Sequence, residues 1–506
     1  MLDLGGHRGR GLAKTIDWWL VACWFLMTMI GIANIYASVH SSEPSSIFDF
    51  SSRSGKQIMW ILTSIGLAAL ILFAIPPRAY EGLSLLIYGG TILLLISVIF
   101  LGIEVKGSRS WFAFGPIRLQ PAEISKISTS LLLATVMSQL GYRIGRMRDF
   151  IITAMIILVP MMIIVLQSET GSALVYVGFI FMLYREGLSG WLIAIIGMAI
   201  LAFILTLTAS PYVAILVIGA VISLCIFLYS GRFKWWLLVG VPVIIFFAFL
   251  PQLLDAISGW ILGAEQVEAI RASIEAGEEV SLPFIMRIKP LPILLGFSFL
   301  SIPVLAFQAF REGNQFTSLG ILAFIGGIIL VFSTNFLFND VLQDHQRKRI
   351  EVLLGMKEDP AGVGYNVRQS KIAIGSGGFF GKGYLKGTQT TYGFVPEQST
   401  DFIFCTIGEE WGFVGTCGVI LLYVFLIWRI INQAERSREG FTRIYGYCVA
   451  CCIFMHLFIN IGMTIGLMPV IGIPLPFISY GGSSMWAFTV MLFIFIALNR
   501  NERKYF

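Results

Sequence analysis

The stretch that decides the fold is the polar segment at residues 339–401, NDVLQDHQRKRIEVLLGMKEDPAGVGYNVRQSKIAIGSGGFFGKGYLKGTQTTYGFVPEQSTD. It contains eight of the chain's 35 Lys and Arg residues and lies between two long apolar regions. A polar connection of this length in a compact protein is usually functional or disordered. Its glycine clusters, GSGG at 375–378 and GKG at 381–383, indicate specified tight turns. We therefore interpret this segment as the working part of the protein and the remainder as its support.

The remainder has the composition of a multi-spanning membrane protein. Of the 506 residues, 57% are apolar and 13% are charged, whereas soluble domains are about one quarter charged. The net charge of +6 does not indicate nucleic-acid binding, because the Lys and Arg residues lie between apolar runs rather than in one patch. The seven cysteines lie in or beside apolar runs, so we expect neither a disulfide framework nor a cysteine metal site.

Fourteen apolar segments have about the 20 residues that a helix needs to cross a bilayer. They are 18–38, 57–75, 83–103, 121–140, 150–167, 171–185, 188–208, 211–230, 235–250, 290–309, 318–338, 401–430, 446–467 and 480–499. With both termini in the cytoplasm, every short cytoplasmic connection carries Arg or Lys, as the positive-inside rule requires. The same orientation places 339–400 outside the membrane.

The Lys and Arg residues of this outer segment are an exception to the positive-inside rule, which places an excess of cations in the cytoplasm. Long loops are partly exempt from the rule, which is one explanation. The other is that cations at the outer surface bind an anionic ligand, such as a lipid phosphate. A second outer connection, 251–289, has the pattern of a short amphipathic surface helix.

Polar residues inside the predicted spans are candidates for function. Glu123 and Lys126 are three residues apart on one helical face, so they form either a buried pair that fixes helix packing or part of a polar cavity. Trp111, between Arg109 and Arg118, is either an interfacial anchor or a platform that stacks on a sugar.

Three further acids lie at a span end or within its first turns, and one histidine lies within an apolar span. We interpret Glu169 as a cap-region acid, and we expect at most one of the adjacent Glu409 and Glu410 to face a cavity. His456 is interpreted as a lone, satisfied core residue. Metalloprotease, Walker A, dinucleotide-binding and Ser-His-Asp patterns are missing from the sequence, so soluble-enzyme chemistry is not indicated.

Several motifs together closely resemble the SEDS family, the shape, elongation, division and sporulation proteins. They are EDPAGVGYNVRQSKIAIGSGGFFGKGYLKGTQ at 358–389, FVPEQSTDFIF at 394–404, EEWGFVG at 409–415, NIGM at 460–463, GIPLPFISYGGSS at 472–484 and QPAEISK at 120–126. The GTQ ending is more similar to the RodA branch than to the FtsW branch. The chain departs from the family at 167–173, where QSETGSA stands in place of the usual QPDLGTA.

The resemblance implies an all-α polytopic membrane fold with a ten-helix core. Residues 1–208 would form the first seven spans and 401–506 the last three. Residues 209–338 would be an insertion with four extra spans, and 339–400 the large extracytoplasmic catalytic loop. We find no role for the insertion in the sequence.

SEDS proteins polymerise glycan strands from lipid II, an undecaprenyl-pyrophosphate-linked disaccharide-pentapeptide, on the outer face of the bacterial plasma membrane. Asp359 matches the family's catalytic aspartate, which implies a general base on the acceptor sugar's 4-hydroxyl in an inverting transfer that releases polyprenyl pyrophosphate. From the residues alone, Asp359 could equally be the start of an Asp-Pro turn.

The same resemblance suggests how substrate is held. Arg349 and Lys371 are assigned to the phosphates by charge and location, with Lys382 and Lys386 as weaker candidates. Gln369, Ser370, Glu397, Glu123, Lys126 and Trp111 complete the predicted substrate-binding set. The loop glycines could let backbone N–H groups approach a phosphate, or could simply form turns.

No covalent cofactor is expected. A divalent cation, Mg²⁺ or Mn²⁺, could be held largely by the substrate pyrophosphate, because the sequence contains no metal cage. By family, the protein partner is a class B penicillin-binding transpeptidase. The alternatives are a lipid II flippase or other transporter, a different ligase of undecaprenyl-linked glycans, and a non-catalytic scaffold of the cell-wall synthesis complex.

Overall fold

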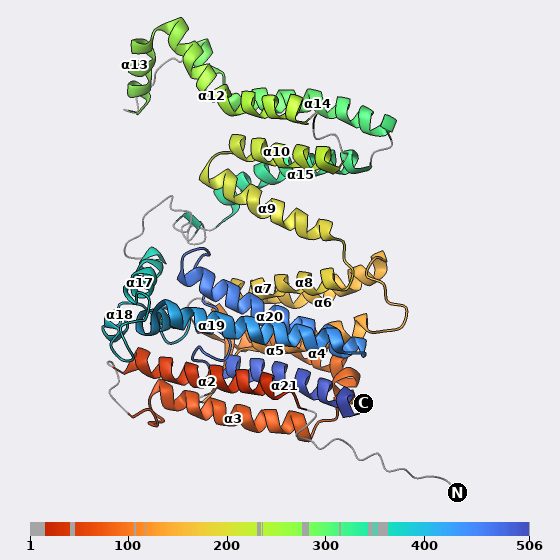
Figure 1. Cartoon of the computed structure of the whole chain (residues 1–506), viewed down its shortest axis with the longest axis vertical. Coiled ribbons are helices and arrows are strands. Elements are labelled where there is room, and N and C mark those ends of the chain that lie inside the picture. The colour runs from red at the N-terminus through yellow and green to blue at the C-terminus, as the bar shows by residue number, and fades with distance from the viewer. Residues whose placement is uncertain are drawn as a thin grey trace. The chain divides into compact units, whose positions relative to one another are not determined.

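The computed structural model describes residues 16–40, 46–105, 108–115, 117–229, 234, 236–275, 283–312, 315–342, 347, 350–351 and 363–504. These residues form helices and one small sheet (Figure 1). The chain divides into two compact units, and each is described by itself. Unit 1 comprises Met1–Leu188 and Glu358–Phe506, and unit 2 comprises Ser189–Lys357.

The long helices of unit 1 run side by side (Figure 1). They are α2 (Trp18–Val39), α3 (Arg53–Phe73), α4 (Pro77–Leu101), α5 (Pro121–Met137), α6 (Met147–Leu166), α19 (Ile403–Arg436), α20 (Gly440–Thr464) and α21 (Gly482–Lys504). Three short segments follow α6: α7 (Thr170–Val175), η1 (Tyr176–Gly178) and α8 (Phe179–Arg185). Two loop helices, α17 (Val363–Ser376) and α18 (Thr388–Thr391), precede α19.

Local sequence explains where several of these helices begin. The Asp17 carboxylate accepts from the N–H of Trp19, and the Ser52 hydroxyl accepts from the N–H of Gly55. Each side chain thereby satisfies one of the N–H groups that a helix leaves unpaired at its start. Pro77 and Pro121 begin α4 and α5, where a residue without an N–H costs nothing.

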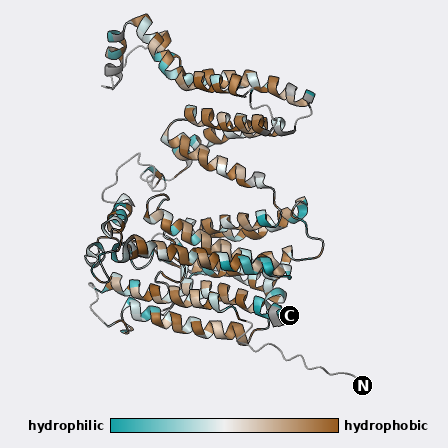
Figure 2. Ribbon diagram, viewed as in Figure 1, coloured by the Kyte–Doolittle hydropathy of each residue, from teal (hydrophilic) through white to brown (hydrophobic). Residues whose placement is uncertain are grey.

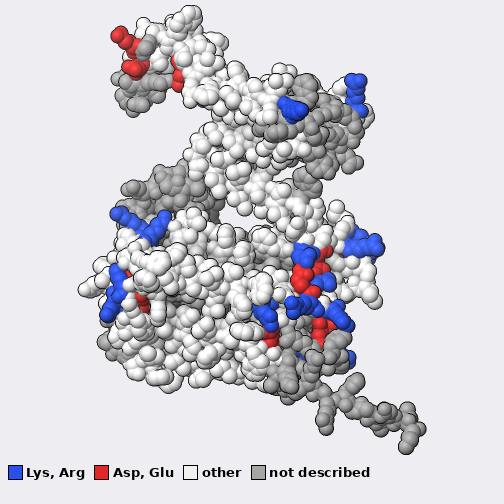
Figure 3. Space-filling view, in the orientation of Figure 1, with Lys and Arg blue, Asp and Glu red and all other residues white. Residues whose placement is uncertain are grey.

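The core of unit 1 lies around α5, α20 and α21. In α20, 83% of the apolar window is buried, against 22% in α4, which therefore presents most of its surface outward. α19 packs on α20, α4 packs on α5, and α21 packs on α3. Figure 2 shows apolar residues along the middle of these helices, and Figure 3 shows that the charged residues of unit 1 on this face gather at the two helix ends.

A small antiparallel sheet occupies the connection between α4 and α5. It consists of β1 (Ile103–Val105), β2 (Ser108–Phe114) and β3 (Ile117–Leu119), in the order β1-β2-β3. Ile103 pairs with Trp111, and Phe112 pairs with Leu119. Gly115 lies in the turn between β2 and β3 with φ +63°, a conformation that glycine adopts without strain. We had not predicted this sheet.

Unit 2 is built around α9 (Gly190–Thr208), α10 (Pro211–Tyr229), α12 (Val241–Leu262), α14 (Pro290–Glu312) and α15 (Gln315–Phe336). Shorter elements are the π-helical segments η2 (Trp236–Gly240) and η4 (Leu337–Val341), the helix α13 (Ala264–Glu275) and the 3-10 turn η3 (Phe284–Arg287). Residues of α10 such as Ile215 and Ile218 form its buried centre. The helix that we expected within 251–289 is present as α13.

The prediction of a predominantly helical polytopic membrane protein is confirmed. Among the described residues, 11 helices are long and apolar enough to cross a membrane, by length and composition. Two shorter apolar helices span Thr170–Arg185 and Ile193–Thr208, and α5 has 17 residues. Each of the fourteen predicted ranges overlaps described helical residues, but the number of crossings stays a prediction. Unit 2 begins at Ser189 rather than at residue 209, so the boundaries of the insertion also stay a prediction.

Gly31 and Gly66 provide a test of helix packing in unit 1. A Cβ atom on Gly31, in α2, would lie 2.7 Å from the carbonyl oxygen of Ile478, whereas one on Gly66, in α3, would meet nothing within 4 Å. We expect Gly31→Ala to lower the free energy of unfolding by about 1–3 kcal/mol through overpacking. Gly66→Ala should be neutral or stabilise by up to about 1 kcal/mol, because alanine favours helix. Thermal unfolding of the purified variants in detergent measures both, and equal effects would contradict the packing described.

Candidate functional site

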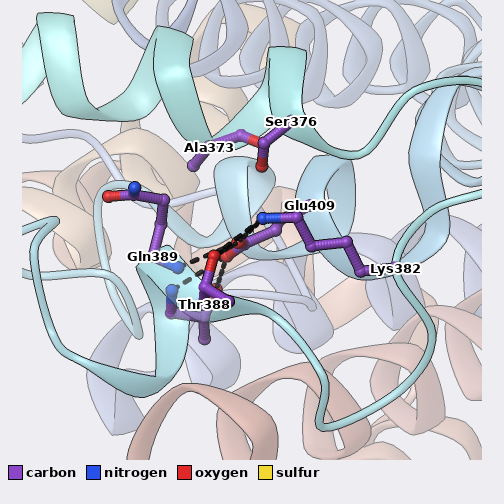
Figure 4. Close-up of polar contacts among 7 residues, drawn as sticks. Ala373, Ser376, Lys382, Thr388, Gln389 and Glu409 are labelled. Carbon is purple, nitrogen blue, oxygen red and sulfur yellow. Dashed lines mark hydrogen bonds and ion pairs between the residues drawn. The ribbon is translucent and has the colours of Figure 1, made fainter.

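Residues of the loop between α17 and α19 surround the buried carboxylate of Glu409, which belongs to α19 (Figure 4). Its Oε1 atom accepts from Lys382 Nζ at 2.7 Å, from the N–H of Gln389 at 2.8 Å and from Thr388 Oγ1 at 3.3 Å. Its Oε2 atom accepts from the N–H and the hydroxyl of Thr390, at 2.8 and 2.7 Å. A buried charge is tolerated only when it is paired and fully hydrogen-bonded, and these five donors meet that condition.

The glycine clusters bring the loop backbone against a kink in α19. Gly412, inside that helix, has φ +63° and ψ −157°. A Cβ atom on Gly377 would lie 2.0 Å from the carbonyl oxygen of Gly408, and one on Gly381 would lie 2.1 Å from that of Glu410. A side chain at either position would therefore displace the backbone.

Four backbone hydrogen bonds fix this approach. The N–H groups of Lys382 and Gly383 donate to the carbonyls of Glu409 and Glu410, both at 3.0 Å. The N–H groups of Phe413 and Val414 donate in return to Gly378 and Phe379, at 2.9 and 3.1 Å. We considered two roles for the glycines, backbone approach to a phosphate and turn formation. These contacts support turn formation.

α17 is attached to the end of α20. The Ser370 hydroxyl donates to the carbonyl of Thr464 at 2.9 Å, and Ala373 packs with Val395, Phe402 and Cys405. Lys371 is exposed beside Gly466, where a Cβ atom would lie 2.6 Å from the lysine Nζ. A cation therefore stands at the surface where the loop meets α20.

The other end of the loop, residues 398–401, is held by three different parts of unit 1. Arg53 Nη1, at the start of α3, donates to Ser399 Oγ at 2.7 Å. The hydroxyl of Ser479 and the N–H of Tyr480 donate to the carbonyls of Thr400 and Ser399, at 2.6 and 2.9 Å. Gln398 Nε2 donates to the carbonyl of Ser38 in α2, at 2.5 Å.

Tyr384 adds a further attachment to α2. Its hydroxyl donates to the carbonyl of Ala33 at 3.1 Å. Burial, with the nearby Glu410 carboxylate, raises the pKa of Tyr384 to about 12, so the hydroxyl keeps its proton at neutral pH. Glu410 itself accepts from the N–H of Leu385 at 3.2 Å through Oε1, while its Oε2 atom has no hydrogen-bond partner among the described residues.

A second buried polar cluster lies in the helix core and consists of Glu123, Lys126 and His456. Lys126 Nζ is 2.7 Å from Glu123 Oε1, 2.8 Å from His456 Nε2 and 5.1 Å from the centre of the Phe488 ring. The Glu–Lys pair that we predicted is therefore formed. The interpretation of His456 as a satisfied core residue is confirmed, because it is buried and both ring nitrogens have partners. It is not a lone polar residue, however, since its ring contacts the lysine of another helix.

The contacts of His456 determine its protonation. Nδ1 is 3.0 Å from the carbonyl oxygen of Pro474, which can only accept, so Nδ1 carries the proton. Nε2 then accepts from the Lys126 ammonium, and the imidazole is neutral. The remaining Oε2 atom of Glu123 has no hydrogen-bond partner among the described residues.

Glu169 is the N-cap residue of α7, in agreement with our interpretation of a cap-region acid, but its side chain makes no capping hydrogen bond. Its Oε1 atom instead accepts from Ser110 at 2.6 Å and from Ser108 at 3.0 Å, both in β2. Gln167 donates to the carbonyl of Leu95 in α4 at 2.8 Å. Residues at the unusual QSETGSA segment thus attach the small sheet to the helix core.

The structure places the predicted site residues in different settings. Asp359 and Arg349 lie outside the described residues. Lys386 is exposed, Lys382 is committed to Glu409, and Ser370 is buried against α20. Gln369 is half-buried on α17, Trp111 is half-buried on β2, and Glu397 is exposed with φ +54°. The described residues contain no group of three His, Cys, Asp or Glu that could hold a metal ion.

Sequence reasoning missed the Glu409 site and the contact of Arg53. One signal was available for Arg53, since a cation directly after an N-cap serine is unfavourable with the helix dipole and so suggests a tertiary partner. No sequence signal indicated the partners of Glu409, because four of its five donors are backbone or hydroxyl groups of α18.

Glu409→Gln tests whether the carboxylate holds the loop. The amide keeps the shape but removes the charge from Lys382 and replaces one acceptor with a donor, so we expect a loss of about 2–4 kcal/mol in the free energy of unfolding. Limited proteolysis should cut the 377–402 region faster. Glu410→Gln is the matched control, since its Oε2 atom has no partner, and it should have a smaller effect. Equal effects would refute the assignment.

The contact between His456 and Lys126 is best tested by a double-mutant cycle. His456→Phe removes the acceptor of a buried ammonium, and Lys126→Met removes the charge. We expect the two changes to be non-additive, with a coupling of about 1–3 kcal/mol in thermal unfolding, because the residues are in direct contact. Additive effects would show that the two side chains do not interact.

The chain is similar in sequence to known proteins. The family model for the cell cycle proteins FtsW, RodA and SpoVE matches residues 17–219 and 293–504. The chain is 28% identical to the peptidoglycan glycosyltransferase MrdB of Escherichia coli K12, covering 86% of this chain and 84% of that protein. It is 29% identical to the peptidoglycan glycosyltransferase RodA of Treponema pallidum, covering 98% and 100%.

A solved structure of a peptidoglycan synthase complex, described as coordinating polymerization and crosslinking, contains a chain with the same fold. It aligns with a TM-score of 0.56 at 22% identity, over 96% of this chain and 98% of that one. The family model leaves 220–292 unmatched, a shorter segment than the insertion that we predicted at 209–338. With both matched segments spanning most of the chain, the resemblance drawn from the motifs is confirmed, and the chain belongs to the FtsW/RodA/SpoVE family of cell cycle proteins.

Proposed function

We infer that this chain is a peptidoglycan glycosyltransferase of the RodA type, which polymerises lipid II into glycan strands on the outer face of the bacterial plasma membrane. The observation that carries the inference is the match to two curated relatives over nearly their whole lengths, both named as peptidoglycan glycosyltransferases. The structure supports it with a polar loop that many contacts hold against the ends of α2, α3, α19 and α20.

The chemistry requires a base, a stabilised leaving group and a surface for lipid-linked substrates. We propose Asp359 as the base that takes the proton from the acceptor sugar's 4-hydroxyl. A base on an outer loop could reach a sugar at the level of the lipid headgroups, which an acid in the middle of a span could not. We further propose that exposed cations of the loop stabilise the leaving pyrophosphate.

The contacts of the described residues reduce the number of lysine side chains that could bind the pyrophosphate. Lys382 is paired with Glu409, and Lys126 is buried with Glu123 and His456, so neither ammonium is free to bind phosphate without losing its partner. Lys371 and Lys386 are exposed and are better candidates, together with Arg349. A divalent cation, if it takes part, would be held mainly by pyrophosphate oxygens.

We propose that both termini are cytoplasmic and that 339–400 is extracytoplasmic. Support comes from Arg185, Arg429, Arg436, Arg443 and Arg500, which belong to the helix ends opposite to the loop. The protein partner would be a class B penicillin-binding transpeptidase. The solved neighbour supports this, since its complex is described as combining polymerization with crosslinking.

The test is glycan synthesis by the purified full chain in phospholipid vesicles with fluorescent lipid II. We expect glycan ladders from the wild type and at least about a 100-fold slower reaction from Asp359→Asn, the range lost with a general base. Asp340→Asn makes the same change elsewhere in the segment and should keep wild-type activity. Headgroup translocation without polymer would favour the flippase alternative, and full activity of Asp359→Asn would remove that residue from the role.

A further inference from the structure

The turn formed by the glycine clusters carries an exposed aromatic surface that the proposed function does not use. It consists of Phe379, Phe380, Trp411 and Phe413, whose side chains are 60%, 79%, 46% and 58% exposed. The Phe379 ring centre lies 4.9 Å from that of Phe380 and 5.7 Å from that of Phe413, which it stacks upon. We call these four residues the aromatic edge. A contiguous exposed apolar patch usually marks an interaction site.

The depth of this surface follows from the charges along α19. Arg429 Nη2 is 2.9 Å from Asp17 Oδ2, and this ion pair marks the polar boundary at one end of the helix. Phe413 precedes Arg429 by sixteen residues of continuous helix, which is about 24 Å. The hydrocarbon core of a bilayer is about 30 Å thick, so Phe413 lies inside it, in the leaflet on the loop side. Glu409, which lies beyond the kink at Gly412 and is paired with Lys382, marks the polar boundary at the loop end of α19.

Phe379 and Phe380 lie at the same depth, because the carbonyl of Phe379 accepts from the N–H of Val414. Irregular backbone is tolerated at this depth only where its polar groups are paired within the protein. The turn meets that condition, since Lys382 and Gly383 donate to α19 and Gly378 and Phe379 accept from it.

We propose that residues 377–383 form a re-entrant turn, and that the aromatic edge is buried among the phospholipid acyl chains of the leaflet on the loop side. Acyl chains are the occupant that the geometry favours. The three phenylalanine rings carry no charged or hydrogen-bonding group, and Phe413 belongs to α19, which is long and apolar enough to cross a membrane. The turn thereby anchors Glu409 and the base of the loop at the membrane surface. This inference does not depend on the proposed activity.

The depth is measured by spin labelling of the full chain in phosphatidylethanolamine–phosphatidylglycerol vesicles. The background carries Cys225→Ser, which removes a cysteine with an exposed side chain. A nitroxide at Phe380→Cys should be several-fold more accessible to oxygen than to a water-soluble nickel chelate. The matched label at Arg368→Cys, an exposed cation of α17, should show the reverse. Equal accessibility at the two positions would overturn the proposal.

A second measurement keeps the proposal testable if the cysteine variant folds poorly. A photoreactive benzoylphenylalanine at position 380 preserves the aromatic ring, and irradiation in native membranes should give phospholipid adducts. Adducts mainly with a second polypeptide would show that a protein helix covers the aromatic edge and would overturn it. The outcome of the crosslinking is independent of the outcome of the glycan assay, because crosslinking requires neither substrate nor turnover.

Discussion

The loop of unit 1 depends on one buried carboxylate. Glu409 receives one ammonium, two hydroxyls and two backbone N–H groups, and it is wholly buried. Removing such a charge from water costs several kcal/mol, which only a complete set of donors offsets. Because the donors come from residues 382–390, the carboxylate can be satisfied only when this part of the loop is folded against α19. The electrostatic requirement of one side chain thus specifies the position of a segment that has little apolar surface of its own.

The glycines make that arrangement sterically possible. Gly377, Gly381 and Gly412 let two backbones approach more closely than any residue with a Cβ atom would allow. The polar and glycine-rich composition of the loop had suggested a surface that approaches a ligand. In the structure, much of it approaches the protein instead, and Lys382 forms an internal ion pair. Positive charge in a loop is therefore a poor guide to ligand contact until its internal partners are known.

The helices were predictable, and most of the polar contacts were not, for a physical reason. Apolar length and proline or cap residues act locally, so the starts of α2 and α5 follow from neighbouring residues. α20, which has no side-chain cap, begins at Gly440 rather than at the predicted residue 446. His456 and Glu409 depend on partners 330 and about 20 residues away, and nothing in the local pattern encodes them. The three-residue spacing of Glu123 and Lys126 indicated their pair, and the motif resemblance supplied the family. It could not supply the geometry of Asp359, which lies outside the described residues.

The Glu123–Lys126–His456 cluster is connected to the end of the loop through the segment between α20 and α21. His456 holds the carbonyl of Pro474, and the same segment donates from Ser479 and Tyr480 to Thr400 and Ser399 at the end of the loop. Asn460, one turn beyond His456 on α20, donates to both Asp401 and Ile473. A displacement of Lys126 would therefore change the partners of His456 and the support of residues 399–401 together. In a low-dielectric core, where unpaired polar groups are costly, such connected hydrogen bonds favour one arrangement of the loop over many.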